Sequence, residues 1–148
     1  MLRLQCLGFS ADETLRTFRR WQETGVLAAY QAHFLFDDVH WIWYALFFTA
    51  VLCRLFERRS VAHRYDWVLL LPLVSGLLDA FENRLQHVFL SEPGFGRVVD
   101  PLPAFSTIAS DLKWLLVICY VSVALALLVG RIGTGASIAT PEGARRSP

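Results

Sequence analysis

Two carboxylates and a lysine inside long apolar stretches are the residues whose types and spacing best suit chemistry. Asp79 and Glu82 belong to a D-x-x-E-N motif that Asn83 completes, and Lys113 is the single lysine among 14 basic residues. A carboxylate in a low-dielectric environment holds its proton more tightly, as a general acid requires. The pattern predicts a catalytic set of Asp79, Glu82 and Lys113, in which either carboxylate is the acid or base.

A second group of polar and aromatic residues predicts ligand binding beside this set. Asp37, His40 and Tyr44 follow one another at helical spacing, so they share one face of a helix. His40 and Tyr44 are suited to positioning charge, and Trp114 directly follows Lys113. The predicted ligand-binding residues are Asp37, Asp38, His40, Tyr44, Asn83 and Trp114.

Metal, cofactor and nucleic-acid functions find little support in the sequence. His40 with Asp79 and Glu82 is the one combination that suggests metal ligands. No two histidines stand four apart on one helix, and no H-E-x-x-H motif occurs. The formal net charge is only +1, so no strong field attracts nucleic acid. We therefore expect no metal, no cofactor and no nucleic-acid partner.

The elements that must position these residues are membrane helices. Of the 148 residues, 55% are hydrophobic and only 18% are charged, whereas a soluble domain carries about 25% charged residues. Stretches at about 34–56, 67–90 and 104–130 each reach the ~20 residues that a spanning helix needs. The predicted fold is an all-α integral membrane helical bundle, formed by one domain over residues 1–130.

The ends of the chain are predicted to lie outside the hydrocarbon. Residues 10–24 fit an amphipathic helix that begins with a capping box at Ser10 and Glu13, and Gly25 ends or bends it. This helix suits either a membrane interface or an ordinary packed surface, and the fold prediction adopts the interfacial position. Residues 131–148 are rich in Gly, Ser, Thr and Pro, which predicts a disordered tail.

Arginine distribution predicts the orientation. Arg54, Arg58, Arg59 and Arg64 fall between the first two spans, whereas only Arg97 falls between the second and third. The positive-inside rule assigns the first loop and the C-terminus to the cytoplasm, making the protein multi-pass with the amphipathic helix outside. Asp79 then lies about 18 Å into a core of about 30 Å. All three spans bring polar residues to this outer-leaflet depth.

Helical phase predicts that these polar residues face one another. One stripe of the second span is small near its middle and polar toward its outer end, and the third span has an equivalent polar side from which Asp111 points away. We expect Lys113 to pair with Asp79 or Glu82, since a lone charge at this depth is costly. The stripe of the second span contains Pro72, Ser75, Gly76, Asp79, Glu82, Asn83 and Gln86, and that of the third contains Ser106, Ser110, Lys113, Tyr120 and Ala124.

The motif series resembles a group of small multi-spanning membrane proteins that has no established activity. The series is D-D-x-x-W-x-x-Y from Asp37 to Tyr44, then D-x-x-E-N from Asp79, then D-x-K-W ending at Trp114. The resemblance covers about residues 10–130. In that group one more span precedes the amphipathic segment, so either such a span precedes Met1 or the chain is naturally short. A weaker likeness is to membrane proteins of the emopamil-binding-protein type, which gather carboxylates and aromatics in a membrane cavity.

Three functional interpretations remain open at this stage. The first is an enzyme or binding protein for a hydrophobic lipid or isoprenoid-like molecule, held in a cavity at outer-leaflet depth. The second is a small transporter or accessory subunit whose carboxylates carry protons or cations. The third is a purely structural bundle. Because three helices leave a polar groove open to lipid, we expect a homo-oligomer, a partner membrane subunit or a leading span to close the groove.

Overall fold

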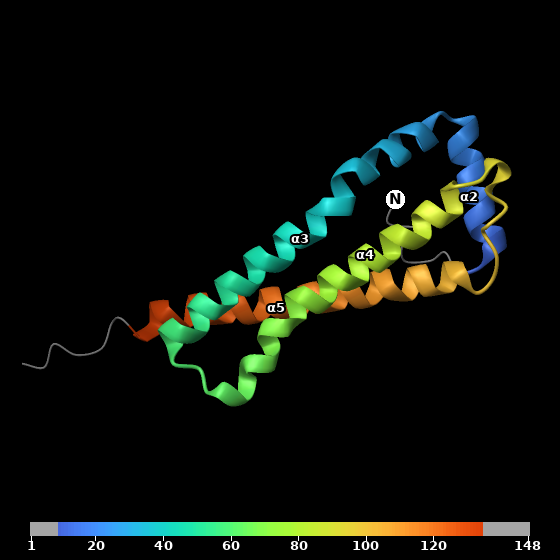
Figure 1. Ribbon diagram of the computed structural model, residues 1–148. Coiled ribbons are helices and arrows are strands. Elements are labelled where there is room, and N and C mark those ends of the chain that lie inside the picture. The colour runs from blue at the N-terminus through green and yellow to red at the C-terminus, as the bar shows by residue number, and fades with distance from the viewer. Residues whose placement is uncertain (1–8, 135–148) are drawn as a thin grey trace, which may run out of the picture.

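The computed structural model describes residues 9–134 of the chain, and the elements in that range are all helices (Figure 1). This confirms the predicted all-helical class. The order is α2 (Ala11–Glu23), α3 (Val26–Arg59), a 3-10 segment (His63–Leu70), α4 (Leu71–Leu90), a short 3-10 turn (Pro93–Phe95) and α5 (Leu102–Thr134).

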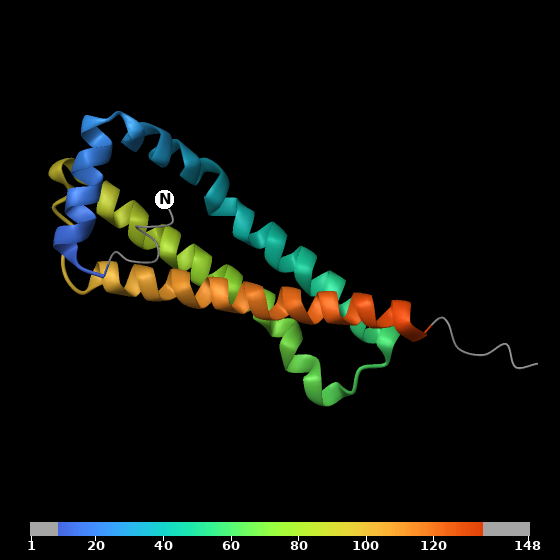
Figure 2. The same ribbon diagram turned by 180° about the vertical axis from the view of Figure 1, so that it is seen from behind.

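The three long helices form a wedge in which α4 packs against both α3 and α5. Figures 1 and 2 show α3 and α5 meeting at one end, here called the narrow end, and diverging toward the other, the wide end, where α2 connects them. At the narrow end Arg59 donates from Nε and Nη2 to the carbonyl of Leu127, at 2.9 and 2.6 Å. At the wide end the backbone N–H of Ala11 donates to Asp100 Oδ1 at 2.9 Å.

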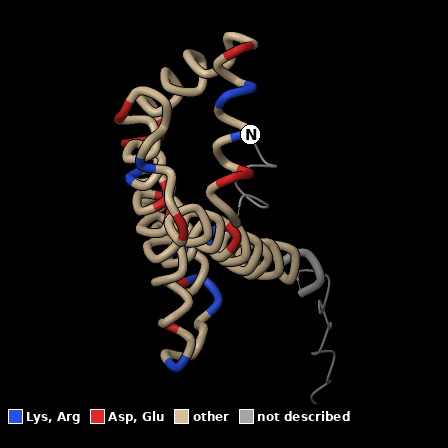
Figure 3. The backbone as a smooth tube through the Cα atoms, turned by 90° about the vertical axis from the view of Figure 1, so that its right-hand side faces the viewer, with Lys and Arg blue, Asp and Glu red and all other residues tan. Residues whose placement is uncertain are grey.

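The helices α3 and α5 are long and apolar enough to cross a membrane. In each, only 17% of the most apolar stretch is buried, so most of its side chains face outward. A core helix of a soluble protein would hide these side chains, and their exposure therefore favours a lipid environment. Figure 3 shows how few charged residues α5 carries along its length.

Helix bounds differ from the predicted spans at several points. Helix α3 begins at Val26 rather than near residue 34, directly after Gly25, whose φ of 74° permits the sharp turn from α2. The segment from residue 67 begins as 3-10 helix, and α4 proper starts at Leu71. Helix α5 runs to Thr134, so the first residues of the expected tail are helical. The remainder of that tail lies outside the described residues.

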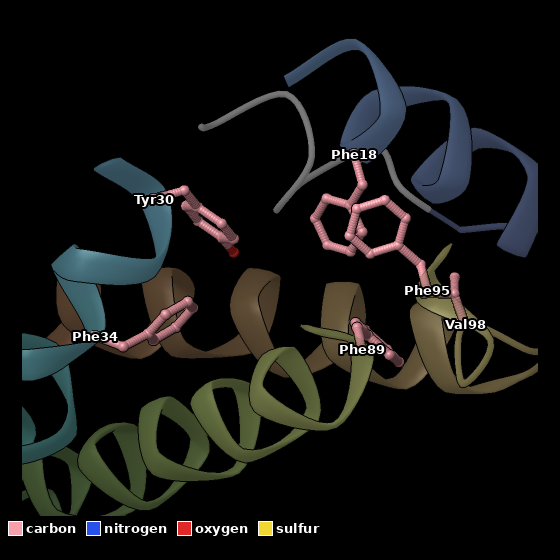
Figure 4. Packing of buried hydrophobic residues seen from close by; sticks show 6 residues of the cluster. All are labelled: Phe18, Tyr30, Phe34, Phe89, Phe95 and Val98. Atoms are coloured by element: carbon pink, nitrogen blue, oxygen red, sulfur yellow. The ribbon is translucent and has the colours of Figure 1, made fainter. Parts of the chain in front are cut away.

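Helix α2 uses its apolar face inside the protein. Ser10 caps it by accepting a hydrogen bond from the Glu13 N–H at 3.3 Å. Phe18 is fully buried, and its ring lies 5.2 Å from that of Phe95. Figure 4 shows this aromatic cluster at the wide end, which contains Phe18, Tyr30, Phe34, Phe89, Phe95 and Val98. This packing favours the alternative of an ordinary packed helix, because the residues suited to a membrane interface already contact protein.

Close contact between α3 and α4 depends on a glycine. A Cβ atom on Gly76 would come within 3.0 Å of the Ala45 Cβ and 3.3 Å of the Trp41 carbonyl oxygen. The predicted small stripe of α4 therefore does bring the two backbones together. Toward the narrow end a second cluster fills the space between the helices, formed by Leu52, Leu55, Phe56, Val68, Tyr120 and Ala124.

Candidate acid–base cavity

The polar stripe predicted on the second span is the buried face of α4. Helical spacing sets all of its members on one side, where α3 and α5 cover them, while Val74, Leu77 and Phe81 on the other side are exposed. The helix is thus inverted relative to a soluble amphipathic helix: its polar face is inside. The buried residues of α4 are Pro72, Ser75, Gly76, Asp79, Glu82, Asn83, Gln86 and Phe89.

A buried ion triad connects α4 to α5. Lys113 Nζ lies 2.7 Å from Asp79 Oδ1 and 2.6 Å from Glu82 Oε2. The exposed fractions are 8% for Lys113, 9% for Asp79 and 1% for Glu82. The predicted pairing of Lys113 is therefore confirmed, and the ammonium bonds both carboxylates rather than one. On the opposite side of α5, Asp111 is exposed, as helical phase predicted.

Tyr44 holds the second oxygen of the Asp79 carboxylate. Its hydroxyl lies 3.3 Å from Asp79 Oδ2 and 3.2 Å from the Ser75 carbonyl oxygen, and it can donate to either. Asp79 is thus oriented by a cation from α5 and a phenol from α3. Glu82 lies farther toward the wide end of α4, behind the ammonium.

A cavity of about 380 Å³ opens between α3 and α5, with Asp79 of α4 among its lining residues. Its lining changes along the helices: His33, Asp37 and His40 lie toward the wide end, whereas Phe48, Val117 and Tyr120 lie toward the narrow end. Such a cavity suits a molecule with one polar end and one apolar end. The complete lining is His33, Asp37, His40, Tyr44, Phe48, Asp79, Lys113, Trp114, Val117 and Tyr120.

The cavity includes six of the nine predicted site residues and leaves out three. Asp38 points away from it and pairs with His87 of α4, with Oδ2 to Nε2 at 2.9 Å. Asn83 donates to the backbone carbonyl of Asp37 at 3.2 Å, so it joins α3 to α4. Glu82 contacts Lys113 but does not line the cavity. The six that line it are Asp37, His40, Tyr44, Asp79, Lys113 and Trp114.

Four lining residues were not among the predicted site residues. His33 is one helical turn before Asp37, and its Nε2 atom lies 3.0 Å from Asp37 Oδ2. A predicted span that began near 34 left it just outside, although the i, i+4 spacing pointed to it. Phe48 continues the face of Tyr44, and Val117 continues that of Lys113, by the same spacing. Tyr120 was predicted to lie on the polar stripe of the third span but was not among the predicted site residues.

The triad geometry argues against a metal between its carboxylates. The ammonium of Lys113 already occupies the position between Asp79 and Glu82, where a cation would have to sit. Across residues 9–134 no cluster of three or more His, Cys, Asp or Glu side chains is arranged to hold a metal ion. The combination of His40, Asp79 and Glu82 considered from the sequence is therefore not assembled.

A second polar bridge joins all three long helices nearer the wide end. Tyr30 of α3 donates to Gln86 Oε1 at 3.1 Å, and Gln86 Nε2 donates to Ser106 Oγ of α5 at 2.9 Å. These buried bonds fix the separation of α3 and α5 beside the aromatic cluster. They therefore keep the polar end of the cavity at a defined width.

Asp79 is one of several titratable groups that line the cavity and could exchange a proton with a bound molecule. Only this carboxylate of the triad faces the open volume, where a bound molecule could reach it. The nearby ammonium and phenol can stabilise its anionic form or charge on a ligand. Comparison with protein-family models, with curated proteins and with solved structures finds no match to this chain.

Proposed function

We propose that the chain is an integral membrane protein with three spans and that its cavity binds and acts on a hydrophobic lipid or isoprenoid-like molecule. Outward exposure of apolar side chains on α3 and α5 supports the membrane position. Helix α4 carries three charged residues, Asp79, Glu82 and Arg84, of which the first two are buried and Arg84 is exposed near the wide end. The rest of its outer face is largely apolar, with Val74, Leu77 and Phe81 exposed. A third span of this kind is supported by its position between the other two.

The observation that carries the proposal is the polarity gradient of the cavity. Asp37 and His40 provide a polar end, and Phe48 and Val117 provide an apolar end about two helical turns away. The cavity opens sideways between α3 and α5, so a lipid-like molecule reaches it from the bilayer. The arginine distribution assigns this part of the bundle to the outer leaflet, with the C-terminus in the cytoplasm.

Asp79 is the proposed acid or base, and Lys113, His40 and Tyr44 position charge around it. Glu82 supports the site from behind, since its carboxylate lies against Lys113 and away from the cavity. A molecule with an ionisable or carbonyl-bearing head would exchange a proton with Asp79 while its chain lies against Val117.

The transporter alternative is less well supported by the packing. Beyond Phe48 the space between the helices is filled by the apolar cluster around Leu52 and Phe56. A cation moving from the cavity toward the narrow end would have to cross this cluster without polar ligands. A closed apolar end fits binding of a chain better than transport of an ion. The structural alternative predicts that no ligand binds at all.

Native mass spectrometry of the detergent-purified full chain tests the proposal. We expect a co-purifying lipid-like species that Val117→Trp removes, because indole fills the apolar end of the cavity. Leu115→Trp is the matched control, since Leu115 lies on the same helix and is 62% exposed. Equal retention of the species by both variants, or its absence from the unmodified chain, would contradict the proposal.

A further part of the proposal is that something closes the lateral opening. The rim residues His40 and Trp114 are exposed beside buried ionic groups, and lipid offers no hydrogen bonds to them. A second copy or a partner membrane subunit at this opening would supply the missing cover. Cross-linking from His40→Cys in native membranes is expected to give a defined higher-mass species, whereas a strictly monomeric product would argue against closure.

A further inference from the structure

A second concave site lies at the narrow end, far from the acid–base cavity along the helices. It has a volume of about 390 Å³ and lies between the last turns of α3 and α5. Two arginines from α3 form its polar part, and leucines from both helices form its apolar part. The lining residues are Leu55, Arg58, Arg59, Leu127 and Leu128. A site with this lining suits an amphiphilic molecule with a negatively charged head, because its charged residues are arginines.

Within the described residues, the two arginines of this site have no acidic partner. Arg54, one turn earlier, is neutralised by Glu57 at 3.1 Å, and Arg64 lies over the Tyr65 ring at 4.8 Å. By contrast, none of the described carboxylates pairs with Arg58 or Arg59. Two neighbouring guanidinium groups without an acid repel each other, and an anion between them removes that cost.

Arg59 is already held in position to receive an anion. Two of its N–H groups bind the Leu127 carbonyl, which fixes the guanidinium plane against the end of α5. A guanidinium has five donors, so three remain for a ligand. Arg58 is exposed next to it and can move to complete a two-point contact. Guanidinium groups match the oxygens of a phosphate in this way.

The apolar part of the site indicates what is attached to the anion. Leu128 is 51% exposed and continues the outward apolar surface of α5. A free phosphate gains nothing from this surface, whereas an acyl chain does. We infer that this narrow-end site binds the phosphate of an anionic phospholipid of the cytoplasmic leaflet. The inference rests on the membrane position proposed above but not on the ligand of the acid–base cavity.

Lipid titration followed by native mass spectrometry tests the inference on the full chain. The probes are phosphatidylglycerol and phosphatidylcholine with identical acyl chains. We expect the purified protein to retain phosphatidylglycerol preferentially, and Arg58→Gln to weaken this binding about 5-fold. Arg54→Gln, the matched control, is expected to change it less than 2-fold because Arg54 already has Glu57 as its partner. Higher salt should reduce the preference in the unmodified chain.

Several outcomes would overturn the inference. Equal binding of both lipids would mean that the arginines form no specific lipid site and only determine the membrane orientation. An equal loss of phosphatidylglycerol binding in Arg54→Gln and Arg58→Gln would mean the same. Displacement of phosphatidylglycerol by millimolar inorganic phosphate alone would identify a free anion instead of a lipid. Val117→Trp separates this inference from the proposed function, since it should leave phosphatidylglycerol binding unchanged while it empties the cavity. Arg58 is exposed, so Arg58→Gln should fold, and its thermal unfolding provides the check.

Discussion

Replacement of Lys113 by methionine perturbs the centre of the bundle with little change in volume. The ammonium is 8% exposed and makes bonds of 2.7 and 2.6 Å to two carboxylates. Its removal leaves Asp79 and Glu82 without a cation in a low-dielectric environment. Loss of one partner of a buried pair costs roughly 3–5 kcal/mol, and we expect Lys113→Met to lower the unfolding free energy by that amount.

The two carboxylates should differ in how much of this loss they recover. Glu82 is 1% exposed, whereas Asp79 faces the cavity and keeps the Tyr44 hydroxyl as a donor. We therefore expect the pair Lys113→Met with Glu82→Gln to recover more than half of the loss. The pair Lys113→Met with Asp79→Asn should recover less, since it leaves the deeper carboxylate unpaired.

The assay is equilibrium unfolding in detergent for the singles and both doubles, evaluated as a double-mutant cycle. Arg54→Gln is the control, because its pair with Glu57 is about two-thirds exposed on both sides and should contribute at most about 1 kcal/mol. Additive effects for both carboxylates, or a nearly silent Lys113→Met, would refute the reasoning. Either result would mean that Lys113 of the detergent-solubilised protein extends toward the surrounding headgroups and does not bridge α4 and α5.

The remaining predictions concern packing and orientation. Gly76→Val should lower the unfolding free energy by about 1–3 kcal/mol, because the valine side chain would meet Ala45 and the Trp41 carbonyl. Denaturant unfolding measures this loss, and Leu77→Val at the neighbouring exposed position is the control. Phe18→Ala should cost about 3–5 kcal/mol, since Phe18 is fully buried beneath α2; a loss near zero would mean that α2 contributes little to the fold. In a background without native cysteines, an impermeant maleimide should label Val99→Cys in intact cells and Ala62→Cys only after permeabilisation, and the reverse pattern would invert the proposed topology.

The sequence was sufficient to predict which faces of α4 and α5 carry the buried polar residues. Helical spacing identified the seven polar or small residues of α4 that the fold buries, and the rarity of lysine directed attention to Lys113. These predictions succeeded because a charge among apolar residues has few tolerable positions, and periodicity alone then determines its direction.

The sequence could not distinguish Asp79 from Glu82 within the D-x-x-E-N motif. Both lie on the same stripe, and only the crossing of α3 over α4 exposes one to the cavity and leaves the other behind Lys113. Helical phase placed Asp37 on the face of His40 and Tyr44, but it could not show that Asp38 pairs with His87 of α4 while Asp37 contacts His33 on its own helix. Such differences depend on interhelical angles, which long-range packing sets.

The charge of the triad gives a reason to look for function at this place rather than for stability alone. Two carboxylates and one ammonium leave one formal negative charge unbalanced among buried groups. Apolar side chains of similar volume often stabilise a buried site as well as ions do, so an ionic lock alone would not need the second carboxylate. Asp79 is the member whose free side faces the cavity, and Tyr44 and Lys113 already orient it. Lys113 and Tyr44 fix this carboxylate on one side while its other side faces the cavity, an arrangement typical of functional sites. The apolar end of the cavity supports our proposal that the ligand carries a hydrophobic chain.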